Sequence, residues 1–184
     1  MEISELIREA KKGSASAQKC LFDLLGDKMM LVCRRYVKTY EDAEEILLDG
    51  FYKFFKNLSS FSYPGEGAVY AWLKKIMINE CLMFLRRRHS FIIATEEEAE
   101  DIPLYDDALN KLSTSEILNL IIDLPVGYRT VFNLYIIEGM THKEIAQLLN
   151  IAEGTSKSQL SKAKLLLQKN LTQKGIEYAR QQSK

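Results

Sequence analysis

The stretch 139–164 constrains the fold of this chain more than any other part of its sequence. It opens with Thr141 and Glu144, whose spacing is that of a Thr-x-x-Glu capping box, a motif that starts an α-helix. Apolar residues then recur at helical spacing on one face, namely Ile145, Leu148 and Leu149. The pattern breaks at 150–152, and a second helix is expected from Gly154 onward. The stretch therefore predicts two helices joined by a short turn.

The second helix of this pair has two different faces. One face buries Ser156, Leu160, Ala163 and Leu167. The other is polar and cationic and consists of Lys157, Ser158, Ser161 and Lys162. This is the layout of a helix-turn-helix, whose second helix buries one stripe and offers the other to the major groove of DNA. An ordinary αα-hairpin packed on a core is the alternative.

The distribution of charge favours DNA binding. Residues 157–184 carry seven Lys or Arg against one acid, Glu177, and a one-sign cationic face suits a phosphate backbone. The formal net charge of the 184 residues is zero. However, residues 1–90 carry 15 basic and 12 acidic side chains, residues 91–113 carry 1 and 7, and residues 114–184 carry 9 and 6. We therefore expect two domains, 1–90 and 114–184, joined by a flexible acidic linker, 91–113.

Cysteine usage and hydropathy predict a soluble cytoplasmic protein. Cys20, Cys33 and Cys81 are far apart and form no C-x-x-C pair, which argues against a disulfide framework or a zinc site. The first turns are charged, unlike a signal peptide, and no apolar run approaches the roughly 20 residues of a membrane span. No metal and no cofactor are expected.

Helical periodicity accounts for every strong secondary-structure signal, so the predicted fold class is all-α. The expected helices cover 1–12, 17–25, 27–37, 40–58 and 68–89, with a break at Gly26 and a cap at Ser14 or Ser16. Helical patterns resume at Ser113 and again at Asp123, before the helix-turn-helix.

Aromatic and cationic residues gather in the second half of the N-terminal domain. The loop 59–67 carries Phe61 and Tyr63, and the helix after it carries Tyr70, Trp72, Lys74, Lys75, Asn79 and Arg86. Rings on which unstacked bases can lie, beside cations that track phosphates, suit single-stranded nucleic acid. The alternative is that Trp72 and the tyrosines are ordinary core aromatics.

Three sequence blocks occur in a fixed order and carry a family resemblance. They are Asp-Ala-Glu-Glu-Ile with Phe-Tyr-Lys-Phe-Phe in 42–55, Ala-Trp-Leu-Lys-Lys-Ile through Leu-Arg-Arg-Arg in 71–88, and Leu-Pro through Leu-Ser-Lys-Ala-Lys in 124–164. Over nearly its whole length, the chain resembles an RNA polymerase sigma factor of the small extracytoplasmic-function group. The resemblance implies binding to core RNA polymerase (clamp and flap) and to promoter DNA, and it raises an anti-sigma factor as a further partner.

The resemblance also implies roles for single residues. The polymerase-binding residues are expected to be Asp42, Glu45, Asp49, Tyr52 and Lys53. Those that bind the −10 element are Phe61, Tyr63, Tyr70, Trp72, Lys74, Lys75, Asn79 and Arg86, with Asn79 and Phe61 lining a pocket for a flipped base. Those that bind the −35 element are Thr155, Lys157, Ser158, Gln159, Ser161, Lys162 and Lys164.

Some positions depart from the family pattern, and two other functions compete with this interpretation. Ser156 replaces a usual Val, Leu48 a usual Gln, and Ile78 and Met83 replace polar or charged residues. The first rival is a conventional helix-turn-helix regulator that is not a polymerase subunit. It leaves the aromatic loop and basic helix of the N-terminal domain unexplained. The second is an enzyme, which the two histidines do not support because neither has a paired nucleophile or a metal-ligand spacing.

Overall fold

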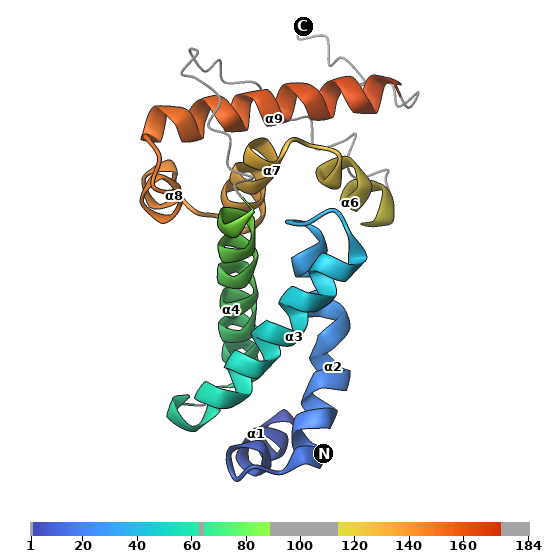
Figure 1. The fold of residues 1–184 in the computed structure, drawn as a ribbon, viewed down its shortest axis with the longest axis vertical. Coiled ribbons are helices and arrows are strands. Elements are labelled where there is room, and N and C mark those ends of the chain that lie inside the picture. Colours follow the sequence, from blue (N-terminus) through green and yellow to red (C-terminus); the bar gives the residue numbers. More distant parts are fainter. Residues whose placement is uncertain (1, 63–64, 89–113, 174–184) are drawn as a thin grey trace, which may run out of the picture. The chain divides into compact units, whose positions relative to one another are not determined.

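The computed structural model describes residues 2–62, 65–88 and 114–173. The predicted linker 91–113 and the predicted site residue Tyr63 lie outside the described residues. The chain divides into two compact units, residues 1–89 and 90–184, and each is described by itself below. Every regular element in the described ranges is helical, which confirms the all-α prediction (Figure 1).

The N-terminal unit is built on three long helices that pack against one another. They are α2 (Ala15–Arg34), α3 (Tyr40–Asn57) and α4 (Glu66–Arg87). The shorter α1 (Ile3–Lys11) packs on α2, and the 3-10 turn η1 (Leu58–Ser60) follows α3 (Figure 1). Between the helices lies an apolar core that includes Leu21, Met29, Phe54, Leu73 and Met77.

Two glycines of this unit behave differently from one another. The predicted break at Gly26 is wrong, because α2 runs through it without interruption. Glycine costs a helix about 1 kcal/mol, and burial of Leu25 and Met29 on either side outweighs that cost. Gly50 of α3 has a packing role, since a Cβ there would overlap the side chain of Met77 on α4. The absence of a side chain lets α3 and α4 approach closely.

The C-terminal unit ends in the expected helix-turn-helix. In chain order it contains α6 (Thr114–Ile122), α7 (Val126–Phe132), the π-helical segment η2 (Asn133–Ile137), α8 (His142–Leu149) and α9 (Glu153–Gln173). The long α9 packs on α6, α7 and α8 (Figure 1). Leu120, Leu124, Leu134, Ile145, Leu160 and Leu167 are buried in its core.

In neither unit is any helix of the described ranges both long enough and apolar enough to cross a membrane.

Candidate polymerase and nucleic-acid interfaces

The capping box at the start of α8 is confirmed. The hydroxyl of Thr141 accepts from the backbone N–H of Glu144 (3.3 Å), and the Glu144 carboxylate accepts from the backbone N–H of Thr141 (2.8 Å). The carboxylate also accepts from the Thr141 hydroxyl (2.7 Å). These hydrogen bonds, the backbone one first, lower the pKa of Glu144 below its ordinary value.

The turn between α8 and α9 depends on one left-handed residue. Asn150 ends α8 with φ at 56°, a conformation that asparagine tolerates better than most residues. The backbone N–H of Ile151 then donates to the carbonyl of Ala146 (3.0 Å). The chain is thereby redirected into α9 within three residues.

A polar contact that the sequence did not predict joins α8 to α9. Nδ1 of His142 lies 2.9 Å from the hydroxyl of Ser156, which is fully buried. The His142 ring also stacks on Tyr135 of η2, with ring centroids 4.4 Å apart. The expected burial of Ser156 is confirmed, but its hydroxyl bonds across the turn and not to its own helix. The His142 side chain is partly buried by these contacts.

The candidate −35 residues on α9 do not form one exposed stripe in the free chain. Lys157 is exposed and pairs with Glu153 (3.0 Å), whereas Lys162 and Lys164 are partly buried. Thr155, Ser158, Gln159 and Ser161 are all buried, so the expected exposure of the two serines is wrong. The binding of these residues to DNA stays a prediction.

Specific contacts occupy two of those buried polar side chains. The hydroxyl of Ser158 donates to the carbonyl of Thr155 (3.1 Å). A Cβ on Gly127 would lie 2.5 Å from Oε1 of Gln159, so this amide fills the space that the glycine leaves on α7. The Gln159 contact joins two helices, so local spacing cannot predict it.

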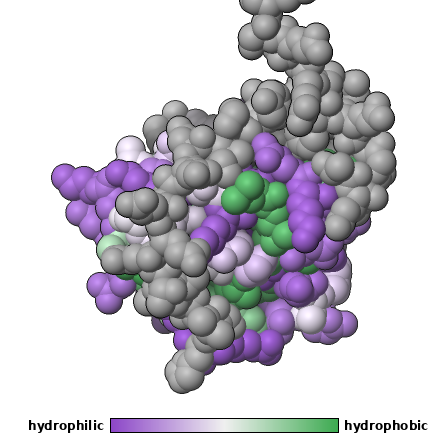
Figure 2. Space-filling model, turned by 90° about the horizontal axis from the view of Figure 1, so that it is seen from above, coloured by the Kyte–Doolittle hydropathy of each residue, from purple (hydrophilic) through white to green (hydrophobic). Residues whose placement is uncertain are grey.

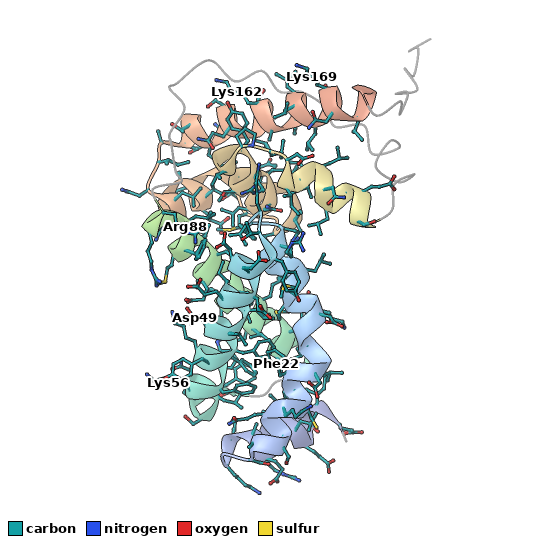
Figure 3. The ribbon with its side chains drawn as sticks, turned by 45° about the vertical axis from the view of Figure 1, so that its right-hand side comes forward. Phe22, Asp49, Lys56, Arg88, Lys162 and Lys169 are labelled. Carbon is teal, nitrogen blue, oxygen red and sulfur yellow. The ribbon has the colours of Figure 1, made fainter. Side chains whose placement is uncertain are left out.

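Cationic residues nevertheless extend from the side of α9 that faces away from α6 and α7. In Figure 3, Lys162 and Lys169 both point in that direction. They are seven residues apart, which is nearly two helical turns. Where the view from the side of α9 shows described residues, these are mostly hydrophilic, with areas of hydrophobic residues between them (Figure 2). One apolar side chain of α9, that of Leu165, is half exposed.

Arg129 has a structural role that the sequence did not predict. Its side chain is buried, and its Nη1 donates to the carbonyls of Ile122 (2.6 Å) and Leu124 (3.1 Å). Burial lowers the pKa of Arg129 to about 10, so the guanidinium remains charged at neutral pH. It ties the end of α6 to α7 and so supports the surface on which α9 packs. The signal available in the sequence was an arginine within a mostly apolar run.

In the N-terminal unit, α4 exposes a polar stripe that contains three of the predicted −10 residues. Lys75, Asn79 and Arg86 are exposed together with Met83, at the spacing of one helix face. Tyr70, Trp72, Lys74 and Phe61 are partly buried. Ile78, which departs from the family pattern, is buried in the core.

The aromatic residues beside this stripe form a layered cluster. Phe61, in the loop after η1, stacks on Trp72 of α4 with ring centroids 4.4 Å apart and planes 5° from parallel. Trp72 in turn contacts the buried ring of Phe54 (5.0 Å). The Trp72 ring therefore touches both the core and the loop, and its contact with single-stranded nucleic acid stays a prediction.

The predicted polymerase-binding residues on α3 fall into an exposed group and a paired group. Glu45, Asp49 and Tyr52 are exposed, Tyr52 to 65%, and Leu48 between them is 55% exposed. In Figure 3, Asp49 and Lys56 lie on the same helix. Nζ of Lys56 lies 5.8 Å from the centroid of the Tyr52 ring. The spacing of these residues gives one continuous outer face of α3.

Asp42 and Lys53 instead form ion pairs with α4 and the residue that caps it. The Asp42 carboxylate accepts from both terminal nitrogens of Arg88, at 3.0 and 3.1 Å. Nζ of Lys53 lies 2.6 and 2.7 Å from the two carboxylate oxygens of Glu80, which is buried. These two residues therefore join α3 to α4 in the free chain, a role that the sequence did not predict.

The described residues contain no group of three or more His, Cys, Asp or Glu side chains that could hold a metal ion. Taken with the preceding observations, the features of the two units are an exposed face of acidic and apolar residues on α3, a polar and aromatic face on α4, and a helix-turn-helix.

Comparison with known protein families identifies the class of protein to which these features belong. The family model for sigma-70 region 2 matches residues 21–91, and the model for sigma-70 region 4 matches residues 114–167, so that together they span more than half of the chain. The chain belongs to the sigma-70 family of RNA polymerase sigma factors. Within that family it is a member of the extracytoplasmic-function (ECF) group, as its curated relatives indicate.

Three of those relatives match nearly end to end. The ECF RNA polymerase sigma factor SigW of Bacillus subtilis is 28% identical, over 93% of this chain and 97% of its own length. The ECF sigma-E factor of Haemophilus influenzae is 25% identical, over 90% and 93%. The ECF sigma factor SigM of Mycobacterium tuberculosis is 28% identical, over 89% and 82%.

Two solved structures are also similar. CnrH, in complex with the cytosolic domain of CnrY, has 20% identity and a TM-score of 0.49, with coverage of 91% of this chain and 96% of that chain. The RsbN–BldN complex has 21% identity and a TM-score of 0.38, with coverage of 89% and 98%.

Family membership establishes the function at the level of the whole chain. It is a sigma factor that binds core RNA polymerase and promoter DNA and directs promoter-specific initiation of transcription. Sigma factors are transcription initiation factors and are not known as enzymes. The alternative of a conventional helix-turn-helix regulator is not favoured.

Proposed function

We propose that this sigma factor works through three surfaces, one on each of α3, α4 and α9. The outer face of α3, with Glu45, Asp49 and Tyr52, binds the clamp of core polymerase. The exposed stripe of α4 and the loop that carries Phe61 bind the −10 element, with Asn79 and Phe61 lining the pocket for a flipped base. The cationic side of α9 binds the −35 element.

The observation that carries the proposal is that the predicted polymerase-binding residues of α3 fall into two groups, one in internal ion pairs and one exposed. Asp42 and Lys53 are used internally, in ion pairs with Arg88 and Glu80. The predicted polymerase-binding residues that stay exposed are Glu45, Asp49 and Tyr52, and Leu48 and Tyr52 together place two exposed apolar side chains beside these acids, which suits a partner surface. The same ion pairs hold α4, so one rigid support carries the polymerase face and the DNA face.

For the C-terminal unit, we propose that Lys157 and Lys162 reach base edges, whereas Lys164 and Lys169 meet phosphates. Thr155, Ser158, Gln159 and Ser161 remain candidates, although all four are buried in the free chain. We further propose that the protein acts in the cytoplasm, has no enzymatic activity and needs no cofactor. Control by an anti-sigma factor stays a prediction.

In vitro transcription tests the whole proposal. The purified chain and core polymerase would be incubated with a library of genomic fragments, and transcripts would be mapped by their 5′ ends. We expect transcripts that depend on both components and share two sequence elements upstream of their starts. A chain that binds these fragments without core polymerase and adds no transcripts would instead be a conventional regulator.

A charge reversal tests the polymerase face. Asp49→Lys should weaken binding to core polymerase by about tenfold, because it places a cation in an acidic face that meets a complementary surface. Lys38→Glu, a charge reversal at another exposed residue just before α3, is the control and should leave affinity unchanged. Equal affinities for the folded Asp49 variant and the unchanged chain would remove Asp49 from the interface.

A further inference from the structure

Helix α1 reaches the loop that carries Phe61. Lys11 is the last residue of α1, and its Nζ donates to the backbone carbonyl of Phe61, fifty residues later in the chain, at 2.6 Å. A hydrogen bond from an ammonium group to a carbonyl is stronger than one between neutral groups. The path of the loop is thereby fixed at the residue whose ring is proposed to meet DNA.

The helix that supplies Lys11 is firmly anchored. Leu6, Ile7 and Ala10 of α1 are buried, and the helix packs on both α2 and η1, the turn just before Phe61. A lysine on a mobile segment would lose most of its bond strength to ordering, whereas an anchored helix avoids that cost. Helix α1 also lies before residue 21, where the match to sigma-70 region 2 begins.

The ring of Phe61 is held from a second side. Trp72 stacks against it at 4.4 Å, nearly parallel, and Trp72 rests on Phe54 in the core. The backbone of Phe61 is thus fixed by Lys11 and its ring by Trp72. One face of the Phe61 ring is occupied by Trp72, so a base can stack only on the other face or against the ring edge.

We propose that α1 is a brace for the base-binding loop, with Lys11 and Trp72 as positioning residues for Phe61. The inference rests on the proposed role of this loop at the −10 element. Flipping a base costs a few kcal/mol of unstacking, and stacking on a ring that is already in place recovers it without a further ordering cost. The brace therefore favours promoter melting and has no part in binding to polymerase.

The neighbouring lysine is a matched control. Lys12 is also exposed, but its Nζ pairs with Glu9 on the same helix (2.9 Å) and not with the loop. Lys11→Met and Lys12→Met remove the same charge from adjacent positions. Lys11→Arg keeps a donor and should restore the behaviour of the unchanged chain.

Trp72 is the only tryptophan of the chain, so its fluorescence reports on the stack directly. In the free full-length protein, we expect Lys11→Met to make Trp72 more accessible to acrylamide, and Lys12→Met to have no effect. In holoenzyme with saturating core polymerase, permanganate footprinting on a promoter selected by the transcription experiment above would follow melting. We expect Lys11→Met to slow melting about three- to tenfold, the loss of one partly exposed hydrogen bond.

Phe61→Ala separates the two hypotheses. If Phe61→Ala slows melting while Lys11→Met matches Lys12→Met, the brace is wrong and the loop keeps its proposed role. If Phe61→Ala leaves melting unchanged, the proposed role of the loop is wrong and the brace falls with it, even where Trp72 fluorescence changes. Slower melting with both Phe61→Ala and Lys11→Met, and with normal polymerase affinity, supports both.

Discussion

The ion pair between Lys53 and Glu80 should be strongly asymmetric, because its two members differ in burial. The Glu80 side chain is 8% exposed, whereas that of Lys53 is 40% exposed. Lys53→Met leaves the buried Glu80 carboxylate without its ammonium partner. For a fully buried pair, such a loss lowers the free energy of unfolding by about 3–5 kcal/mol. Here we expect about 2 kcal/mol, because water can reach the site from the Lys53 side. Glu80→Met leaves an ammonium that can turn into solvent, at a cost of up to about 1 kcal/mol.

Trp72 fluorescence can follow this unit within the full chain, because no other tryptophan contributes. For a unit of this size, about 2 kcal/mol corresponds to a fall of roughly 10 °C in Tm. The double variant, Lys53→Met with Glu80→Met, should be close to Glu80→Met alone, since no buried charge remains. A larger loss for Glu80→Met than for Lys53→Met would refute the reasoning. Binding of Lys53→Met to polymerase, measured where it is folded, should be nearly normal.

Three further predictions concern the other surfaces. Asn79→Ala should slow melting of the −10 element without loss of polymerase affinity, and unchanged permanganate reactivity would remove Asn79 from the pocket. Lys164→Ala should weaken binding to cognate and scrambled duplexes alike and reduce the salt slope by about one, whereas Lys162→Ala should lose about 1–3 kcal/mol on the cognate duplex only. Hydrogen bonds from Thr141 lower the pKa of Glu144, so the stability that its carboxylate contributes should be complete above the unfolded-state pKa. This contribution should be lost as the pH falls through the lower folded-state pKa. The free energies of unfolding of Glu144→Gln and of the unchanged chain should therefore converge in acid.

Features encoded within a few residues could be predicted from the sequence. The capping box of α8 needs only Thr141 and Glu144, and the start of α2 needs only the Ser14 hydroxyl, which accepts from Ala17. These local signals were enough to identify the helices and the helix-turn-helix. The break at Gly26 was wrong because a local penalty was weighed without the burial that offsets it.

Features that depend on distant residues could not be predicted. Glu80 is 27 residues from Lys53 in the sequence. No local pattern shows that Lys53, which was predicted to bind polymerase, instead pairs with a buried carboxylate. The same limit applies to Ser158 and Ser161, since spacing gives the direction of a side chain on a helix but not what covers it. The family resemblance predicts the surfaces, and only tertiary contacts separate the predicted residues that are exposed from those that support the fold.

The π-helical turn η2 has a consequence for grafting. The backbone N–H of Glu138 donates to the carbonyl of Asn133, five residues earlier (2.9 Å), so this turn holds one residue more than an α-helical turn would. Deleting one residue here would remove this wide turn and change the path of the chain from α7 to α8, because each residue of an α-helix contributes about 100° of rotation and 1.5 Å of rise. The residue count between Phe132 and Thr141 therefore sets the azimuth at which the DNA-binding helices leave α7. Chimeras that exchange promoter specificity by transplanting α8 and α9 should preserve this count, whatever residues fill it.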